Sequence, residues 1–183
     1  RKEEAIKAGI CGFVEKPLFH SALENCIMEH LNGKAQPVHQ PLTFDFSGRT
    51  FLLVEDNELN REIALELLGN LGASLETAVN GEEAVNRFKE SPPGFYSLIL
   101  MDIQMPVMNG YEAARAIRSL GRADAVSVPI IAMTADAFVE DIQNSKAAGM
   151  NGHMAKPLDY EGMSREISKY LNNDYKRRED FYE

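Results

Sequence analysis

Five short apolar runs alternate with amphipathic helical patterns between residues 49 and 173, and this alternation limits the possible folds more than any other feature. Continuous apolar runs are typical of parallel strands that are covered on both faces. We predict such strands over 50–54, 75–79, 97–103, 129–135 and 152–155. The helical periodicity predicts helices from 57 or 58 to about 71, from 81 through 88, and over 110–120, 138–148 and 159–171. Strands that alternate with helices predict an α/β fold with a doubly wound parallel sheet.

Two of these elements carry more detailed expectations. In the first predicted helix, Ile63, Leu67, Leu68 and Leu71 share one face, which we expect to be buried, and Gly72 is expected to end the helix. The run over 97–103 is the most apolar of the five, so it is expected to be a central strand.

An internal repeat with an offset of 140 residues links the two ends of the chain. Nine identities fall in one ungapped stretch: Ala8, Gly9, Gly12, Lys16, Pro17, Leu18, Ile27, Leu31 and Asn32 recur at 148, 149, 152, 156, 157, 158, 167, 171 and 172. We therefore expect residues 1–33 to be the C-terminal remnant of a preceding domain, followed by a linker over 34–48. Residues 49–173 are expected to form one complete copy, and 174–183 a tail. Since the sequence begins with Arg1, we expect a longer parent protein.

Charge and cysteine content argue against several classes of protein. The chain has 28 acidic and 19 basic residues and a net charge of −9, which argues against the basic face needed to bind nucleic acid. Its two cysteines predict no disulfide framework and fit a reducing compartment, so we expect a cytoplasmic location. No apolar run approaches the roughly 20 residues of a membrane span, so we expect no direct membrane insertion of this segment.

Polar side chains follow four of the five predicted strands at the point where each strand ends. Glu55 and Asp56 follow the first strand, Asp102 ends the third, Thr134 ends the fourth, and Lys156 follows the fifth. Because the carboxyl ends of parallel strands meet at one edge of the sheet, where ligands bind in such folds, these side chains are expected to converge.

This convergence predicts phosphoryl-transfer chemistry. Three neighbouring carboxylates repel one another and favour a divalent cation, and Mg²⁺ suits hard oxygen ligands with open positions. Asp102 is placed to act as the nucleophile toward phosphorus, and Lys156 can pair first with Asp102 and then with the phosphoryl group. The Thr134 hydroxyl can donate to a phosphoryl oxygen. These are the parts that phosphoryl transfer by positioning and charge neutralisation requires.

Four segments, LLVEDNELNR, LILMDIQMPVMNGYEAARAIR, IIAMTA and AGMNGHMAKPLD, resemble the receiver (response-regulator) domain of two-component phosphorelay signalling. The residues of these motifs are most similar to those in receivers of hybrid sensor histidine kinases with tandem receivers. The resemblance covers about residues 49–173, and residues 1–33 resemble the end of a preceding receiver. It implies a flavodoxin-like (βα)5 three-layer sandwich with a five-stranded parallel sheet in the order 2-1-3-4-5.

The resemblance also implies roles for individual residues. Asp102 corresponds to the phosphorylated aspartate, and Glu55 and Asp56 to the acidic pair that binds Mg²⁺, with Asp56 the more direct ligand. The backbone carbonyl of Gln104 is expected to complete the protein ligands. Lys156 corresponds to the active-site lysine, which in this family precedes a proline in a cis peptide bond.

Two switch positions complete the implied site, and one of them departs from the family. Thr134 corresponds to the switch hydroxyl. The residue three before the lysine is often Tyr or Phe in receivers, and here it is His153. A histidine there can add sensitivity to pH, or it can be an exposed strand-end residue without a role.

The expected partners also follow from the resemblance. Phosphohistidine on a histidine kinase dimerisation domain or on a histidine phosphotransfer protein donates to Asp102, and the partner is expected to meet the first helix near Asn57 and Asn60. The chain has no ATP-binding motif, so only self-phosphotransfer and autodephosphorylation at Asp102 are expected here, in a parent histidine kinase with a possible membrane anchor. Residues 1–33 are expected to dock on the complete domain or to form a homodimer by swapping.

Three alternatives remain open on the sequence. The first is a stand-alone tandem-receiver response regulator. The second is a flavodoxin-like nucleotide or flavin binder, which predicts a first loop rich in Gly, Ser or Thr, whereas the loop here is Glu55-Asp56-Asn57. The third is a degenerate receiver used only for protein interaction, which predicts the loss of an acid or of the lysine, and all of these are present.

Overall fold

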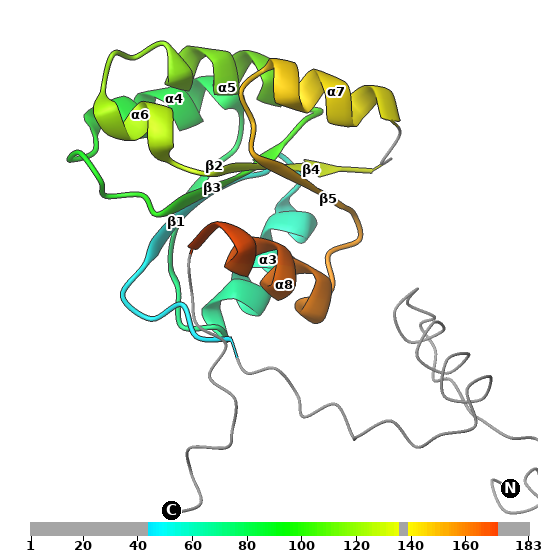
Figure 1. Cartoon of the computed structure of the whole chain (residues 1–183). Coiled ribbons are helices and arrows are strands. Elements are labelled where there is room, and N and C mark those ends of the chain that lie inside the picture. Colours follow the sequence, from blue (N-terminus) through cyan, green and yellow to red (C-terminus); the bar gives the residue numbers. More distant parts are fainter. Residues whose placement is uncertain (1–43, 136–138, 172–183) are drawn as a thin grey trace, which may run out of the picture. The chain divides into compact units, whose positions relative to one another are not determined.

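The computed structural model describes residues 44–135 and 139–171 (Figure 1). The predicted remnant over 1–33, the predicted tail over 174–183 and most of the predicted linker lie outside these residues. Where the linker is described, it packs on the domain: Phe46 is fully buried, donates its backbone N–H to the Leu71 carbonyl, and lies 5.6 Å from the Phe51 ring between centroids.

A five-stranded parallel sheet forms the centre of the described residues, with strand order β2-β1-β3-β4-β5. Its strands are β1 Thr50–Val54, β2 Ser74–Ala78, β3 Leu98–Asp102, β4 Ile130–Thr134 and β5 Gly152–Ala155. In register, Val54 lies between Ala78 and Met101, so that β1 and β3 end side by side. The predicted strand order and the central position of the most apolar run are confirmed, since all five residues of β3 are buried.

Helices cover both faces of the sheet, which confirms the predicted three-layer α/β sandwich (Figure 1). Their bounds are α3 Glu58–Gly69, α4 Gly81–Glu90, α5 Gly110–Arg118, α6 Ala123–Ser127, α7 Val139–Ala147 and α8 Tyr160–Leu171. The α3 and α8 helices pack on one face, and α4, α5 and α6 on the other. Alternate residues of each strand feed the two cores: Leu53 packs toward α3 and α8, and Leu52 toward α4 and α5.

Three sequence expectations need correction. The α6 helix was not expected, because its five residues are too few to show helical periodicity. Ile63 is 44% exposed, and the small Ala64 is buried in its place together with Leu68. The first helix ends at Gly69 rather than near Leu71, which is nevertheless buried. The remaining strand and helix boundaries differ from the predicted ones by one or two residues, as frayed ends commonly do.

Asparagine caps hold three helix N-termini at the carboxyl edge of the sheet. The side chains of Asn57, Asn80 and Asn109 accept hydrogen bonds from backbone N–H groups in the first turns of α3, α4 and α5. At α5, the Glu112 side chain accepts a hydrogen bond from the backbone N–H of Asn109, which completes a capping box. These caps therefore fix where α3, α4 and α5 begin, directly after the loops that follow β1, β2 and β3.

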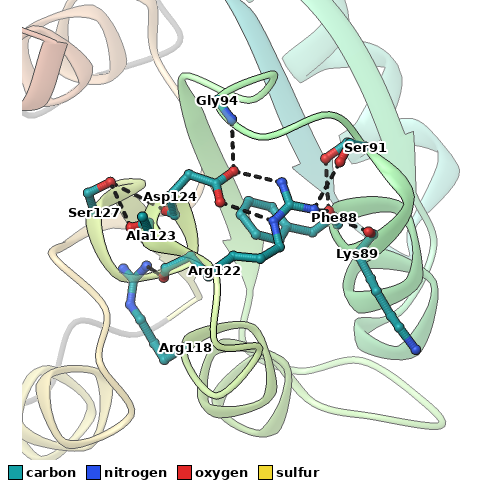
Figure 2. A network of polar contacts seen from close by, with 10 residues as sticks. Phe88, Lys89, Ser91, Gly94, Arg118, Arg122, Ala123, Asp124 and Ser127 are labelled. Carbon is teal, nitrogen blue, oxygen red and sulfur yellow. Dashed lines mark hydrogen bonds and ion pairs between the residues drawn. The ribbon is translucent and has the colours of Figure 1, made fainter.

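A network around Arg122 joins several elements at the opposite, amino-terminal edge of the sheet (Figure 2). Arg122 donates to the carbonyls of Phe88, Lys89 and Ser91, which end α4, at 2.8, 3.1 and 2.9 Å. Its guanidinium also lies 4.9 Å from the Phe88 ring centroid and forms a two-pronged ion pair with Asp124. Asp124 in turn accepts the backbone N–H of Gly94 at 2.8 Å. The network joins α6 to the end of α4 and to the loop before β3.

Among residues 44–135 and 139–171, the structure shows no helix with the length and apolar character needed to cross a membrane.

Candidate functional site

Three carboxylates meet at the carboxyl edge of the sheet. Glu55 and Asp56 directly follow β1, and Asp102 is the last residue of β3, the strand beside it. One oxygen of each lies within 4.8 Å of the others. Glu55 and Asp102 are buried, with 1% and 6% exposure, and Asp56 is exposed. The structure therefore brings together the acids that the sequence predicted, with one of them open to solvent.

Lys156 is shared by two of these acids. It follows β5, and its Nζ lies 2.6 Å from Glu55 Oε2 and donates to Asp102 Oδ2 at 2.8 Å. The peptide bond between Lys156 and Pro157 is cis, as the family resemblance implied. A single ammonium group thus bridges the acid that follows β1 and the acid that ends β3.

The charges of this site do not balance. Three carboxylates and one ammonium leave a formal charge of −2. Burial raises the pKa of the Asp102 carboxyl, because the hydrogen bond from Lys156 only partly offsets the loss of solvent and the nearby Glu55 adds repulsion. Burial alone lowers the pKa of Lys156, but its hydrogen bonds to Asp102 and Glu55 outweigh burial and raise it. One cation cannot compensate two buried acids, so the pocket favours further positive charge.

Three other predicted residues occupy different surroundings. The backbone N–H of Gln104 donates to Asp102 Oδ1 at 3.3 Å, which places this backbone segment beside the predicted nucleophile. Thr134 ends β4, is partly buried, and accepts the Lys156 backbone N–H at 2.7 Å with its carbonyl. His153 lies on β5 opposite Ala132 and lines a groove of about 450 Å³ between α7 and α8, with Ile142 and Tyr170.

Sequence reasoning missed two residues that support the acids. Asn60 was expected on the partner face, but its side-chain amide donates to Glu55 Oε1 at 3.0 Å. Both oxygens of Glu55 are therefore engaged, one by Asn60 and the other by Lys156. Arg61 donates to the backbone carbonyls of Glu55 and Asp56 at 3.0 and 3.3 Å. The only available signal was position, since both residues lie in the first turn of the helix that follows the acidic pair.

The loop from Ile103 to Gly110 is closed at its base beside Asp102. The Gly110 N–H donates to the Ile103 carbonyl at 3.0 Å, and a Cβ on Gly110 would lie only 2.2 Å from the Asp102 carbonyl oxygen. At the tip, the Met108 N–H donates to the Pro106 carbonyl at 2.8 Å around Val107, whose φ is +70°. This is a γ-turn of the rare, strained, positive-φ form.

With this fold and site described, the comparisons with known proteins give one family. The sequence model of the response regulator receiver domain matches residues 51–168, more than half of the chain. The chain therefore belongs to the response regulator receiver domain family. This membership makes it a receiver domain of two-component phosphorelay signalling and disfavours the nucleotide or flavin binder.

Relatives of known architecture are similar over the same region. The peroxide stress-activated histidine kinase mak1 of Schizosaccharomyces pombe is 39% identical over 127 residues, which are 69% of this chain but only 8% of that kinase. The receiver domain of the sensor histidine kinase PA1611 of Pseudomonas aeruginosa, solved with a magnesium ion in its active-site cleft, is 35% identical with a TM-score of 0.62. That match covers 69% of this chain and 100% of the PA1611 receiver.

A third relative was solved with a signalling partner. It is the co-crystal structure of the Saccharomyces cerevisiae histidine phosphotransfer protein Ypd1 and the receiver domain of its downstream response regulator Ssk1. The match is 30% identical, with a TM-score of 0.61, and covers 79% of this chain and 100% of the other. The resemblance to receivers that the sequence motifs indicated is thereby confirmed.

Proposed function

We propose that the chain accepts a phosphoryl group from phosphohistidine onto Asp102, with Mg²⁺, and that it does so within a hybrid sensor histidine kinase. The observation that carries this proposal is the meeting of three carboxylates around one lysine at the ends of β1, β3 and β5. The similarity to mak1 supports the parent class. A stand-alone response regulator with tandem receivers is the alternative parent.

The donor set fits a hard divalent cation. Three carboxylate oxygens within 4.8 Å of one another, in a pocket with excess negative charge, are the ligands that Mg²⁺ prefers. We assign Glu55, Asp56, Asp102 and the backbone carbonyl of Gln104 as its holders, and the PA1611 receiver supports this choice of metal. Bound there, the ion supplies positive charge to a phosphoryl oxygen. The exposed Asp56 is the acid that a hydrated ion reaches first.

The chain's own residues orient the transfer. An Asp102 carboxylate oxygen attacks phosphorus, a P–O bond forms as the P–N bond of phosphohistidine breaks, and the electron pair stays on the histidine nitrogen. Lys156 already holds Asp102 Oδ2 at 2.8 Å, so it fixes the nucleophile before transfer and pairs with the phosphoryl oxygens afterwards. Thr134, at the end of β4, is the residue whose hydroxyl then turns to the phosphoryl group.

The switch continues from β4 to β5. Movement of Thr134 changes the packing of the neighbouring strand, where His153 lines the groove between α7 and α8. We assign His153 as the residue that reports phosphorylation on that face. A cytoplasmic location belongs to the same proposal, because the chain has only two cysteines, which imply no disulfide framework and fit a reducing compartment.

The donor is a phosphohistidine on a helical domain, either the kinase dimerisation domain or a phosphotransfer protein. The relative solved with Ypd1 supports a partner of this class. We propose no nucleic-acid partner, in keeping with the net charge of −9.

The test is incubation with phosphoramidate and Mg²⁺, followed by intact-mass measurement. The expected result is a gain of one phosphoryl group, which Asp102→Asn abolishes and which Asp56→Asn strongly slows. Glu90→Gln is the matched control, since Glu90 is an exposed acid at the end of α4. Absence of any mass gain in the wild-type chain contradicts the proposal, as does a gain that survives Asp102→Asn.

A further inference from the structure

The first turn of α3 contacts the acidic pair that precedes it. Asn60 donates its side-chain amide to Glu55 Oε1 at 3.0 Å. Arg61 donates to the backbone carbonyls of Glu55 and Asp56 at 3.0 and 3.3 Å. Both donor side chains are half-buried. Neither bond caps the helix, because the Asn57 side chain already accepts the Asn60 backbone N–H at 3.1 Å. The contacts therefore need an explanation other than helix formation.

Asn60 determines which oxygen of Glu55 faces Lys156. Glu55 is 1% exposed, so each of its oxygens needs a partner inside the protein. Because Asn60 holds Oε1, Oε2 is the oxygen that contacts Lys156 Nζ, at 2.6 Å. An ammonium group has three donors, so without the amide the Glu55 carboxylate can turn both oxygens toward Lys156. That rotation takes Glu55 out of the position in which it shares a pocket with the other two acids.

Arg61 holds the backbone that carries the acidic pair. The Glu55 N–H donates to the Ala78 carbonyl at 3.0 Å, one residue beyond the end of β1. The carbonyls of Glu55 and Asp56 then accept from one Arg61 nitrogen, Nη1, instead of from a neighbouring strand. The Asp56 side chain is exposed, so its position depends on the backbone to which it is attached. Arg61 therefore limits the movement of the acid that solvent reaches.

The charge of Arg61 opposes the binding of a cation, so its place beside the acids points to a positional role. A guanidinium group near the carboxylates reduces their attraction for a further positive ion. If Arg61 acted by charge alone, its removal would strengthen the binding of a cation. A charged donor also forms stronger hydrogen bonds to carbonyl oxygens than a neutral donor does, which favours a fixed backbone. The charge and positional roles therefore predict opposite effects of the same substitution.

We propose that Asn60 and Arg61 are positioning residues for the acids that hold the metal. Asn60 orients the Glu55 carboxylate, and Arg61 fixes the backbone of Glu55 and Asp56. This inference rests on the proposed phosphoacceptor function and gives Asn60 a role inside the domain. Partners that orient metal ligands typically contribute about 10–100-fold to metal affinity or activity. Because neither residue contacts the reacting atoms of Asp102, the effect belongs to the affinity for Mg²⁺ and not to the maximal rate.

The test measures Mg²⁺ binding to the full chain from backbone amide NMR shifts, beside phosphoramidate labelling at increasing Mg²⁺ concentration. Asn60→Ala and Arg61→Ala are each expected to raise the dissociation constant for Mg²⁺ by about tenfold. At saturating Mg²⁺, their labelling rates are expected to return to within about threefold of the wild-type rate. Arg61→Lys keeps a charged donor and is expected to bind Mg²⁺ more tightly than Arg61→Ala.

Two variants matched by residue type serve as controls, and a double-mutant cycle tests the route. Asn86→Ala in α4 and Arg115→Ala in α5 remove an exposed amide and an exposed guanidinium, and both are expected to keep the wild-type dissociation constant. In a Glu55→Met background Asn60 has no carboxylate to orient, so Asn60→Ala is expected to change the dissociation constant by less than about twofold. An undiminished tenfold effect in that background would show that Asn60 does not act through Glu55, against the proposal.

The remaining outcomes separate this inference from the proposed function. If Asn60→Ala and Arg61→Ala bind Mg²⁺ as tightly as the controls and slow only transfer from phosphorylated Ypd1, the two residues belong to a partner surface and the inference is overturned. Tighter Mg²⁺ binding by Arg61→Ala shows that Arg61 acts through charge, and labelling that stays slow at saturating Mg²⁺ shows a role beyond affinity; either result overturns the inference. In all these cases a labelled wild-type chain leaves the phosphoacceptor function standing. A wild-type chain that neither binds Mg²⁺ nor gains a phosphoryl group overturns both.

Discussion

Gly110 allows α5 to begin in contact with the backbone of the proposed phosphoacceptor, and replacing it tests the site without touching a reactive group. In Gly110→Ala, the new Cβ would lie 2.2 Å from the Asp102 carbonyl oxygen and 3.1 Å from the Ile103 Cα. A normal C···O contact is about 3.3 Å, so the two groups have to separate by about 1 Å. The obstacle is backbone, so no side chain can rotate to make room.

The expected cost follows from this clash. Overpacking of a well-packed region typically costs about 1–3 kcal/mol, and a rigid backbone obstacle belongs at the upper end. Alanine recovers about 0.5–1 kcal/mol relative to glycine in a helix. We therefore expect Gly110→Ala to lower the free energy of unfolding by about 2 kcal/mol, which moves the urea midpoint by about 1 M. A displacement of Asp102 by about 1 Å is expected to slow its phosphorylation by at least about tenfold.

The assay pairs urea unfolding with phosphoramidate labelling, and Gly69→Ala is the control. Gly69 is the last residue of α3, and a Cβ there meets nothing within 4 Å. That variant is expected to be as stable as wild type or slightly more stable, with unchanged labelling. A Gly110→Ala protein with wild-type stability and wild-type labelling would show that α5 does not constrain the Asp102 backbone, and the reasoning would be refuted.

Three further predictions concern charge. Burial raises the pKa of Asp102 in the folded chain, so the stability of the wild-type protein falls as pH rises through the range between the unfolded and folded pKa values. Asparagine does not titrate, so in the absence of metal Asp102→Asn is expected to have a higher free energy of unfolding than wild type at pH 7. Urea titrations are expected to show that this difference shrinks toward pH 4. In Lys156→Met, two buried acids lose their shared cation, and the free energy of unfolding is expected to fall by about 3 kcal/mol. Millimolar Mg²⁺ is expected to restore part of this loss, and equal stability with and without the metal would contradict the prediction. Arg122→Ala is expected to accelerate hydrogen exchange at the Gly94 amide while phosphoramidate labelling stays unchanged.

The grouping of the acids was predictable because it depends on topology. Apolar runs end where strands end, and parallel strands end at one edge, so the position of Asp102 after its run was enough to place it beside Glu55. The position of Lys156 followed in the same way from the fifth run. None of these inferences requires knowledge of a side-chain rotamer.

The missed features depend on local geometry that residue type alone does not reveal. Asn60 reaches Glu55 only because α3 begins two residues earlier and turns that side chain toward the strand end. Valine favours extended backbone, so the residue type of Val107 does not predict its positive φ. Ala64, rather than Ile63, faces the sheet, which the pattern of large apolar residues concealed.

The Arg122 network gives the two ends of the sheet different mechanical characters. At the amino-terminal edge, one guanidinium holds three carbonyls and one carboxylate, so this end is cross-braced (Figure 2). At the carboxyl edge, the links run through residues of the proposed site: Lys156 bridges Glu55 and Asp102. We expect the braced end to move less on phosphorylation, because the Arg122 network contains none of the residues proposed to bind the phosphoryl group. Because the chain has no tryptophan, a single one introduced at exposed Val126 provides a stationary optical marker against which displacement of the opposite loops can be measured.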